Sequence, residues 1–197
     1  QATVGNLNFQ ERDNTDYLIY EGSTDPVYNG SLGNTFNYKG FHLNLFLTYA
    51  FGNVVRLDPA FSAKYNDLTS MTHDFKNRWM QPGDENVTNV PGVVSRYEYE
   101  QNSTLLATAY NAYNYTSVRT AKGDFIRLKE ISLAYDFPHR WFEKSPVNNI
   151  SLKLQATNLM LLYADKKLNG QDPEFMNAGG VASPMPKQFT LTLKLGL

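Results

Sequence analysis

The sequence predicts an all-β fold, an antiparallel transmembrane β-barrel of which this chain forms one segment. Three features predict it: runs in which apolar side chains alternate with polar or small ones, the length of these runs, and the long irregular stretches that follow every second run. A strand that crosses a bilayer obliquely needs about 9–11 residues, whereas strands of globular proteins usually have about 5–6. The clearest run, residues 41–52, belongs to the longer class.

The run 41–52 reads FHLNLFLTYAFG and has two distinct faces. Most of its even positions are small or polar, with Phe46 the exception, and its odd positions are large and apolar: Phe41, Leu43, Leu45, Leu47, Tyr49 and Phe51. Successive side chains leave opposite faces of a strand, so this period of two predicts a β-strand. Aromatic ends with leucines between them are typical of a lipid-facing strand. A long strand of a soluble β-sandwich has the same pattern, and that alternative stays open.

A hairpin precedes and includes this run. Residues 1–27 are polar and rich in turn formers, so we expect a loop there with at most one short strand. Residues 29–38 place Leu32, Phe36 and Tyr38 on one face of a strand. Lys39-Gly40 then forms the two-residue connection, because glycine supplies the positive φ that tight hairpins require.

The alternation disappears over residues 53–122. A structureless loop of that length inside a compact domain would count against the assignment unless the loop is functional. Outer-membrane barrels have short periplasmic turns and long extracellular loops, so we assign 53–122 to a long extracellular loop. We expect parts of it to be helical, for instance residues 62–80.

The alternation returns at residues 124–137 with a slip in its middle. Ile126 and Leu128 are in one phase, and Ile131, Leu133, Tyr135 and Phe137 are in the other. Either a β-bulge lies at Lys129-Glu130 or the first half of the strand lies beyond the membrane. A cationic side chain facing lipid at mid-bilayer costs roughly 2–4 kcal/mol. We therefore expect Arg127 and Lys129 not to share the lipid-facing register of Ile131.

Two further strands complete the chain. Residues 138–149 form a short connection that places Trp141 and Phe142 for an interfacial belt. The strand 150–156 alternates, and Lys153 on its second face indicates a watery or polar side. Residues 161–186 form a second long loop, and 187–197 alternate without a break to the last residue.

About five strands follow from this pattern, and five cannot close a bilayer-spanning barrel. Single-chain bacterial barrels have an even number of strands, starting at about eight. Unpaired backbone groups at two open edges cannot lie in hydrocarbon. We therefore expect this chain to be part of a larger barrel, with the other strands supplied by upstream sequence or by another chain.

The composition argues against several classes of function. A net charge of -1 gives no basic surface for nucleic acid, and the absence of cysteine excludes disulfides and thiolate chemistry. His42, His73 and His139 are isolated, and we expect His42 to be a lumen or turn residue. The acidic residues of 84–85 and 172–174 fit turn chemistry better than a glycosidase carboxylate pair. We expect no enzyme activity, no metal and no cofactor.

Aromatic residues are the compositional feature that stands out, with 13 Tyr and 12 Phe. Tyrosine and tryptophan offer rigid faces with a polar tip, suited to stacking on sugars or to burial against a partner protein. The alternative is that these tyrosines pack the loop on itself and on the barrel rim, and both remain open. The candidate ligand or partner contacts are Trp79, Tyr97, Tyr99, Tyr110, Tyr113 and Tyr115.

Five motifs occur in order along most of the chain. They are 26–30 (PVYNG) with 36–41 (FNYKGF), 78–79 (RW) with 82–85 (PGDE), 123–129 (GDFIRLK) with 135–138 (YDFP), 158–159 (NL) with 172–174 (DPE), and the terminal alternating strand. Together they resemble the C-terminal end of the SusC/RagA family of TonB-dependent outer-membrane transporters. In that family the last residue is usually aromatic, whereas here it is Leu197. The family's acidic, glycine-rich upstream loop is reduced to residues 11–16, so no calcium site is carried over.

The resemblance implies that residues 1–197 form the C-terminal part of a barrel of about 22 strands. It implies a plug domain and a TonB-contacting segment upstream, neither of which is in these residues. It also implies a bacterial outer-membrane location, a SusD-like surface lipoprotein at the extracellular mouth, and an oligosaccharide or peptide as cargo. The expected function is TonB-dependent nutrient import. The alternative from a different class is a secreted, soluble β-sandwich that binds carbohydrate.

Overall fold

The computed structural model describes residues 15–66, 68–177, 180–181, 183 and 185–196. The chain divides into two compact units. The first is built mainly from Val55–Ala121, and the second from Gly22–Val54, Lys122–Asn177 and Val181–Leu197.

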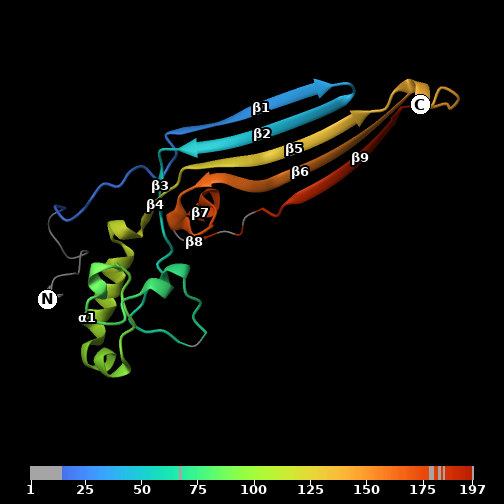
Figure 1. Cartoon of the computed structure of the whole chain (residues 1–197). Helices are drawn as coiled ribbons and strands as arrows, with labels where there is room; N and C mark the ends of the chain where they lie inside the picture. The colour runs from blue at the N-terminus through green and yellow to red at the C-terminus, as the bar shows by residue number, and fades with distance from the viewer. Residues whose placement is uncertain (1–14, 67, 178–179, 182, 184, 197) are drawn as a thin grey trace. The chain divides into compact units, whose positions relative to one another are not determined.

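The second unit contains a five-stranded antiparallel sheet in the order β1-β2-β5-β6-β9, which follows the chain (Figure 1). Its strands are β1 (Tyr28–Tyr38), β2 (Phe41–Phe51), β5 (Phe125–Asp136), β6 (Asn149–Ala164) and β9 (Gln188–Gly196). They contain 11, 11, 12, 16 and 9 residues. The predicted antiparallel sheet of five long strands is therefore confirmed.

Shorter elements lie between these strands. Two-stranded sheets pair β3 (Val54–Arg56) with β4 (Thr120–Lys122), and β7 (Met176–Asn177) with β8 (Gly180–Val181). The first unit contains the α-helix α1 (Arg96–Asn114). In the part of the chain that the structure describes, no helix is both long and apolar enough to cross a membrane.

Two sequence-based expectations need correction, and a third agrees with the structure. The helix occupies 96–114 and includes most of the tyrosine-rich segment that we expected in a loop, whereas residues 62–80 hold only the short 3₁₀ helix His73–Asn77 among their described positions. Strand β6 continues to Ala164, beyond the predicted end at 156, because it bends instead of stopping, with Asn158 at a φ of 54°. Residues 15–27 contain one isolated bridge, at Ser23, and no strand, in agreement with the expected loop.

A β-bulge at Lys129 explains the slip in the sequence pattern of β5. Leu128 pairs with Leu47 of β2 and Glu130 pairs with Phe46, so Lys129 is an extra residue with no partner of its own on β2. An extra residue returns the following side chains to the opposite phase. Ile126 and Leu128 therefore share a face with the later apolar residues of β5, and the bulge alternative is confirmed.

The register joins the apolar residues of all five strands into one face. One row across the sheet contains Phe36, Leu43, Leu133, Leu154 and Leu191. A neighbouring row on the opposite face contains Asn37, His42, Ala134, Lys153 and Thr192. We call these two sides the apolar face and the polar face of the sheet. Arg127 lies on the polar face, as predicted, because it pairs with Thr48.

The apolar face is largely uncovered. Phe189 is 71% exposed and Leu191 is 68% exposed, while the leucines of β2 are half-buried by their neighbours. Among the described residues of this unit, no second layer packs on this face. A soluble β-sandwich would bury these side chains against a second sheet about 10 Å away.

Aromatic rings extend the apolar face at the hairpin end. The ring centroids of Phe41 and Tyr135 are 4.4 Å apart, those of Tyr135 and Phe137 5.0 Å, and those of Phe137 and Trp141 5.7 Å. Trp141 thus ends a continuous ladder of rings. Phe142, which we expected in the same belt, contacts the His139 ring, and the two ring centroids are 5.4 Å apart.

The hairpin between β1 and β2 turns in two residues, as predicted. Lys39 has a φ of 45° and Gly40 a φ of 83°. Two consecutive positive φ angles define the type I′ turn, whose twist matches that of the paired strands. A Cβ on Gly40 would also lie 2.9 Å from the carbonyl oxygen of Asp136. Glycine is therefore required there for conformation and for space.

We predict that Gly40→Ala lowers the free energy of unfolding by about 2 kcal/mol or more, from left-handed backbone strain plus steric overlap. Gly170→Ala is the matched control, because its φ is 84° and no atom lies within 4 Å of its added Cβ. The control should lose only about 1–2 kcal/mol. Urea unfolding of the purified protein measures both, and equal losses would contradict the role given to the Asp136 carbonyl.

Candidate functional site

The first unit is organised around α1, which begins at a capped N-terminus. The backbone N–H of Glu98 donates to Oγ of Ser95 at 3.2 Å, which satisfies one of the unpaired donors of the first turn. Arg96 and Glu100 form an exposed ion pair one turn apart at 2.7 Å. The helix is kinked at Asn102, whose φ and ψ of -134° and 32° are not helical.

An aromatic core packs one face of α1 against the preceding segment. Phe61, Ala63 and Tyr110 form its buried centre. The half-buried residues around them are Phe75, Val90, Val94, Tyr99, Leu106 and Tyr113. The rings of Phe61 and Tyr113 meet edge to face at 5.3 Å, a geometry that aromatic pairs prefer.

Two buried polar side chains fix this core. The Asn114 side-chain amide donates to the Phe61 carbonyl at 2.7 Å, and its oxygen accepts from the Phe61 N–H at 3.3 Å. Arg119 donates to the Asp74 carboxylate at 3.2 Å and to the Asp58 carbonyl at 2.9 Å. Buried polar groups are costly unless they are bonded in this way. Residue types alone do not distinguish them from the other Asn and Arg residues of the loop.

Helical periodicity divides the candidate tyrosines into two groups. Tyr99, Tyr110 and Tyr113 lie on the inward face of α1, and the Tyr110 hydroxyl donates to the Gly92 carbonyl. Tyr97 is 74% exposed and Tyr115 is also exposed. The packing role that the sequence left open therefore applies to the inward group, whereas a contact with ligand or partner remains a prediction for all of them.

Trp79 lies in a turn that the PGDE motif builds. The Trp79 indole N–H donates to the Glu85 carboxylate at 3.1 Å, which also accepts the Gly83 N–H at 2.8 Å. These hydrogen bonds hold the pKa of the Glu85 carboxyl below its usual value, and the bond from Trp79 has the largest effect. The Asp84 carboxylate accepts the N–H groups of Met80 and Gln81 at 3.0 and 3.1 Å. Both carboxylates serve turn chemistry, as expected.

A groove of about 500 Å³ adjoins the inward tyrosines. Its lining includes Ala63, Lys64, Tyr65, Val94, Tyr99 and Glu100. The Lys64 ammonium lies 5.9 Å from the centre of the Tyr99 ring, within reach of a cation–π attraction. The groove thus combines an apolar, aromatic floor with charged side chains. Tyr99 is the candidate residue that belongs both to the core and to this groove.

The described residues of the first unit thus present a groove and several exposed aromatic side chains. Within the described residues, no cluster of His, Asp and Glu could hold a metal ion. His42 lies on the polar face beside the hairpin turn, with its ring nitrogens 2.6 Å from Asn37 Oδ1 and 2.9 Å from Asp136 Oδ2.

A buried ion cluster on the polar face joins two of the sequence motifs. Arg127, from GDFIRLK, binds the Asp172 carboxylate, and its Nε lies 3.1 Å from Glu174 Oε2, in DPE. Arg127 is 5% exposed. The sequence located both motifs but not their contact, because 45 residues separate Arg127 from Asp172.

Comparison with known proteins agrees with this fold. Solved structures of the RagAB peptide importer superpose on the chain with TM-scores of 0.65 in the 'closed-closed' state and 0.64 in the 'open-open' state. They cover 89% and 90% of this chain and 18% of the importer chain, at 21% and 19% sequence identity. At such low identity the likeness establishes the fold.

Sequence relatives carry the decisive information. The TonB-dependent receptor P39 of Formosa agariphila is 25% identical over 192 residues, which cover 91% of this chain. The chain is a relative of the TonB-dependent receptors. Receptor P3 of the same organism is 26% identical over 160 residues, or 78% of the chain. The matched regions span 17% and 13% of these receptors, and no protein-family model matches.

These findings confirm the resemblance predicted from the motifs. The relatives found are receptors and an importer, which is consistent with a protein that is not an enzyme.

We predict that the first unit loses stability as the pH rises above about 10. Burial raises the pKa of Tyr110 to about 12, and burial also raises the pKa of Tyr65 and Tyr113. The unfolded chain therefore releases these protons at lower pH than the folded chain, so stability falls between about pH 10 and 12. Tyr110→Phe should reduce this pH dependence and Tyr97→Phe should not. Unfolding followed by far-UV circular dichroism measures it, and identical slopes in both variants would contradict the burial of Tyr110.

Proposed function

We propose that this chain is the C-terminal part of the barrel of a TonB-dependent transporter in the bacterial outer membrane. In this proposal the apolar face of the sheet meets lipid and the polar face lines the water-filled interior. The whole barrel has about 22 strands, the size class of plugged transporters. The plug domain, the remaining strands and the TonB-contacting segment belong to sequence outside residues 1–197.

The single observation that carries the proposal is the continuous apolar face of the sheet. Each of its five strands contributes large apolar side chains, and the side chains of β9 there are exposed. A water-soluble protein rarely exposes apolar patches larger than a few hundred Å². Contact with lipid tails removes the unfavourable free energy that these apolar side chains would have in water. The exposed apolar face favours the transporter over the soluble carbohydrate-binding sandwich, which would bury these side chains between two sheets.

The two edge strands support a larger barrel. In the described sheet, β1 pairs only with β2, and β9 pairs only with β6. Backbone N–H and C=O groups in hydrocarbon must be hydrogen-bonded, which closed barrels achieve by leaving no edge. We propose that further strands of the same transporter pair with β1 and β9.

The proposed activity is import of a nutrient, an oligosaccharide or a peptide, energised through TonB. The name of the receptor relatives and the RagAB fold support this class of activity. RagAB is a peptide importer, which makes a peptide one candidate cargo here. We further propose a SusD-like surface lipoprotein as partner at the extracellular mouth.

The exposed tyrosines of the first unit are the proposed contacts with cargo or with that lipoprotein. Residues 101–118 contain no charged side chain, so the outward face of α1 beyond its kink is uncharged. Interface centres are depleted in charge and enriched in tyrosine. Tyr115 follows the end of this uncharged stretch of helix and is exposed, whereas the exposed Tyr97 precedes the kink, between Arg96 and Glu98. Trp79 is 38% exposed on its turn.

Paired cysteine substitutions test the orientation of the sheet. The 197 residues contain no cysteine, so Lys153→Cys and Leu154→Cys place a thiol on opposite faces of adjacent positions in β6. In proteoliposomes containing the full-length transporter, a water-soluble maleimide should label the variant at 153 at least tenfold faster than the variant at 154. The reason is that hydrocarbon excludes a charged reagent and keeps a thiol protonated.

Denaturation in urea supplies the control, because both thiols should then react at the same rate. Equal labelling in proteoliposomes would contradict the membrane orientation. A full-length protein that is monodisperse in buffer without detergent would also contradict the membrane orientation.

A second experiment tests the tyrosine contacts. Tyr97→Ala and Tyr115→Ala should weaken binding of the lipoprotein or cargo at least fivefold, because they remove exposed rings without disturbing the core. Tyr110→Phe is the matched control, since it removes a hydroxyl from a buried ring and leaves the surface unchanged. Isothermal titration with the co-purified partner and with candidate oligosaccharides and peptides measures affinity. Unchanged affinity in both exposed variants would remove these tyrosines from the contact surface.

A further inference from the structure

The segment 165–176, which follows β6, packs tightly within the second unit. Leu168 in this segment is 1% exposed and is the largest fully buried side chain among the described residues. The Asp165 carboxylate accepts the N–H of Lys122 at 2.9 Å and that of Lys167 at 3.0 Å. Met176 at the other end is also buried. The segment is therefore fixed at several points and differs from a solvated loop.

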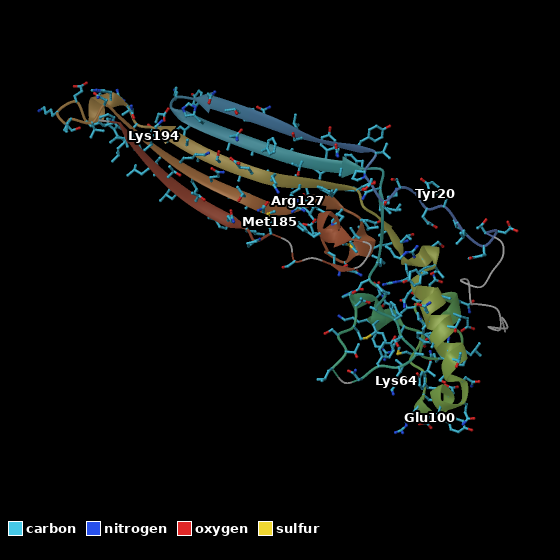
Figure 2. All side chains as sticks on the ribbon, turned by 180° about the vertical axis from the view of Figure 1, so that it is seen from behind. Tyr20, Lys64, Glu100, Arg127, Met185 and Lys194 are labelled. Carbon is cyan, nitrogen blue, oxygen red and sulfur yellow. The ribbon has the colours of Figure 1, made fainter. Side chains whose placement is uncertain are left out.

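The buried ion cluster fixes the middle of this segment to the polar face of the sheet. Arg127 pairs in register with Thr48 of β2 and Leu161 of β6, which places it on the polar face of the sheet; it is labelled in Figure 2. Its guanidinium carbon lies 5.7 Å from the ring centre of Phe125, in the same strand, and 5.9 Å from that of Phe175, in the segment. Arg127 thus lies between two rings, one from the sheet and one from the segment.

The DPE motif supplies both carboxylates that Arg127 needs. Asp172 binds the guanidinium with one oxygen, and its other oxygen accepts the Glu174 N–H at 3.1 Å, which caps the short turn that follows. Glu174 adds a second, half-exposed carboxylate 3.1 Å from Arg127 Nε. If the segment moved away, the guanidinium would lose both carboxylates and would gain water in their place, so the ion pairs resist detachment to the extent that they are stronger than hydration. The cluster therefore opposes detachment of the segment.

We infer that the segment 165–176 is a fixed part of the transport path, and that Arg127 is the residue that positions it. The inference rests on the proposed function, in which the polar face lines the barrel interior. Barrel interiors are filled in some families by inward-folded loops. Around Arg127 the segment covers the polar face of the sheet, so the segment faces the barrel interior there. On β9 the polar-face residues Thr190 and Thr192 are exposed, so the covering is local.

Hydrogen–deuterium exchange of the full-length transporter in detergent tests the positioning role. Arg127→Gln should accelerate exchange of the amides of 168–176 at least tenfold and leave the amides of β9 unchanged. Lys153→Gln is the matched control, because it removes a cation from the same polar face outside the cluster. Unchanged exchange in Arg127→Gln would overturn the inference.

Thiol labelling tests whether the segment covers the path. Thr48→Cys lies opposite Arg127 on the polar face, and Thr192→Cys lies on its exposed part. In proteoliposomes of phosphatidylethanolamine and phosphatidylglycerol, a water-soluble maleimide should label the Thr48→Cys variant at least fivefold more slowly than the Thr192→Cys variant. Adding Arg127→Gln should remove most of this difference. Faster amide exchange without faster labelling at 48 would overturn the inference, because the segment would then lie outside the path.

A milder variant keeps the test decisive if Arg127→Gln fails to assemble. Glu174→Gln removes the half-exposed carboxylate and leaves the Asp172 pair, and it should accelerate exchange of the segment at least twofold. No acceleration would overturn the inference. Failure of the proposed function has a separate signature: the Leu154→Cys variant would label as fast as the Lys153→Cys variant, while protection at 48 persists.

Discussion

The sheet depends on keeping most of its large apolar side chains on one side of five strands, with Phe46 and Phe125 among the exceptions. A strand alternates strictly, so one unmatched residue moves all later side chains to the other face. In β5 the charged pair Lys129-Glu130 interrupts the pattern, and the bulge at Lys129 absorbs the extra residue. As a result Arg127 lies on the polar face while Ile131 lies on the apolar face, although both are odd-numbered. A single backbone irregularity thus allows a buried cation and a continuous apolar surface in the same strand.

Much of the sheet could be predicted because its information is local. A period of two needs only neighbouring residues, so residues 41–52, the Lys39-Gly40 turn and the slip in β5 were readable directly. The end of β6 was not, because Asn158 interrupts the alternation without ending the strand. The helix 96–114 was missed because its signals are weak: a Ser95–Glu98 cap, one ion pair and a kinked, charge-free body. The Arg127–Asp172 contact depends on tertiary structure and has no local signature.

The tyrosines show how far composition alone can lead. Their abundance indicated binding, yet the helix places Tyr110 and Tyr113 against Phe61 and leaves Tyr97 exposed. Residue type could not separate the two groups, since the separation depends on the phase of a helix whose position was not predicted. The first unit therefore has its own aromatic core, and its binding potential depends on the side chains that this core does not use.

The two surfaces of the sheet imply different histories of substitution. In the proposed membrane orientation, fluid acyl chains fill any gap beside a leucine on the apolar face. The side chains there need only remain apolar, and exchanges among Leu, Ile, Val and Phe should be nearly neutral. The Arg127 guanidinium and the Asp172 carboxylate permit no such freedom, because both are buried and losing either one leaves the other without its charged partner. Homologues should thus vary freely at the apolar positions of the sheet while preserving Arg127 and Asp172 together.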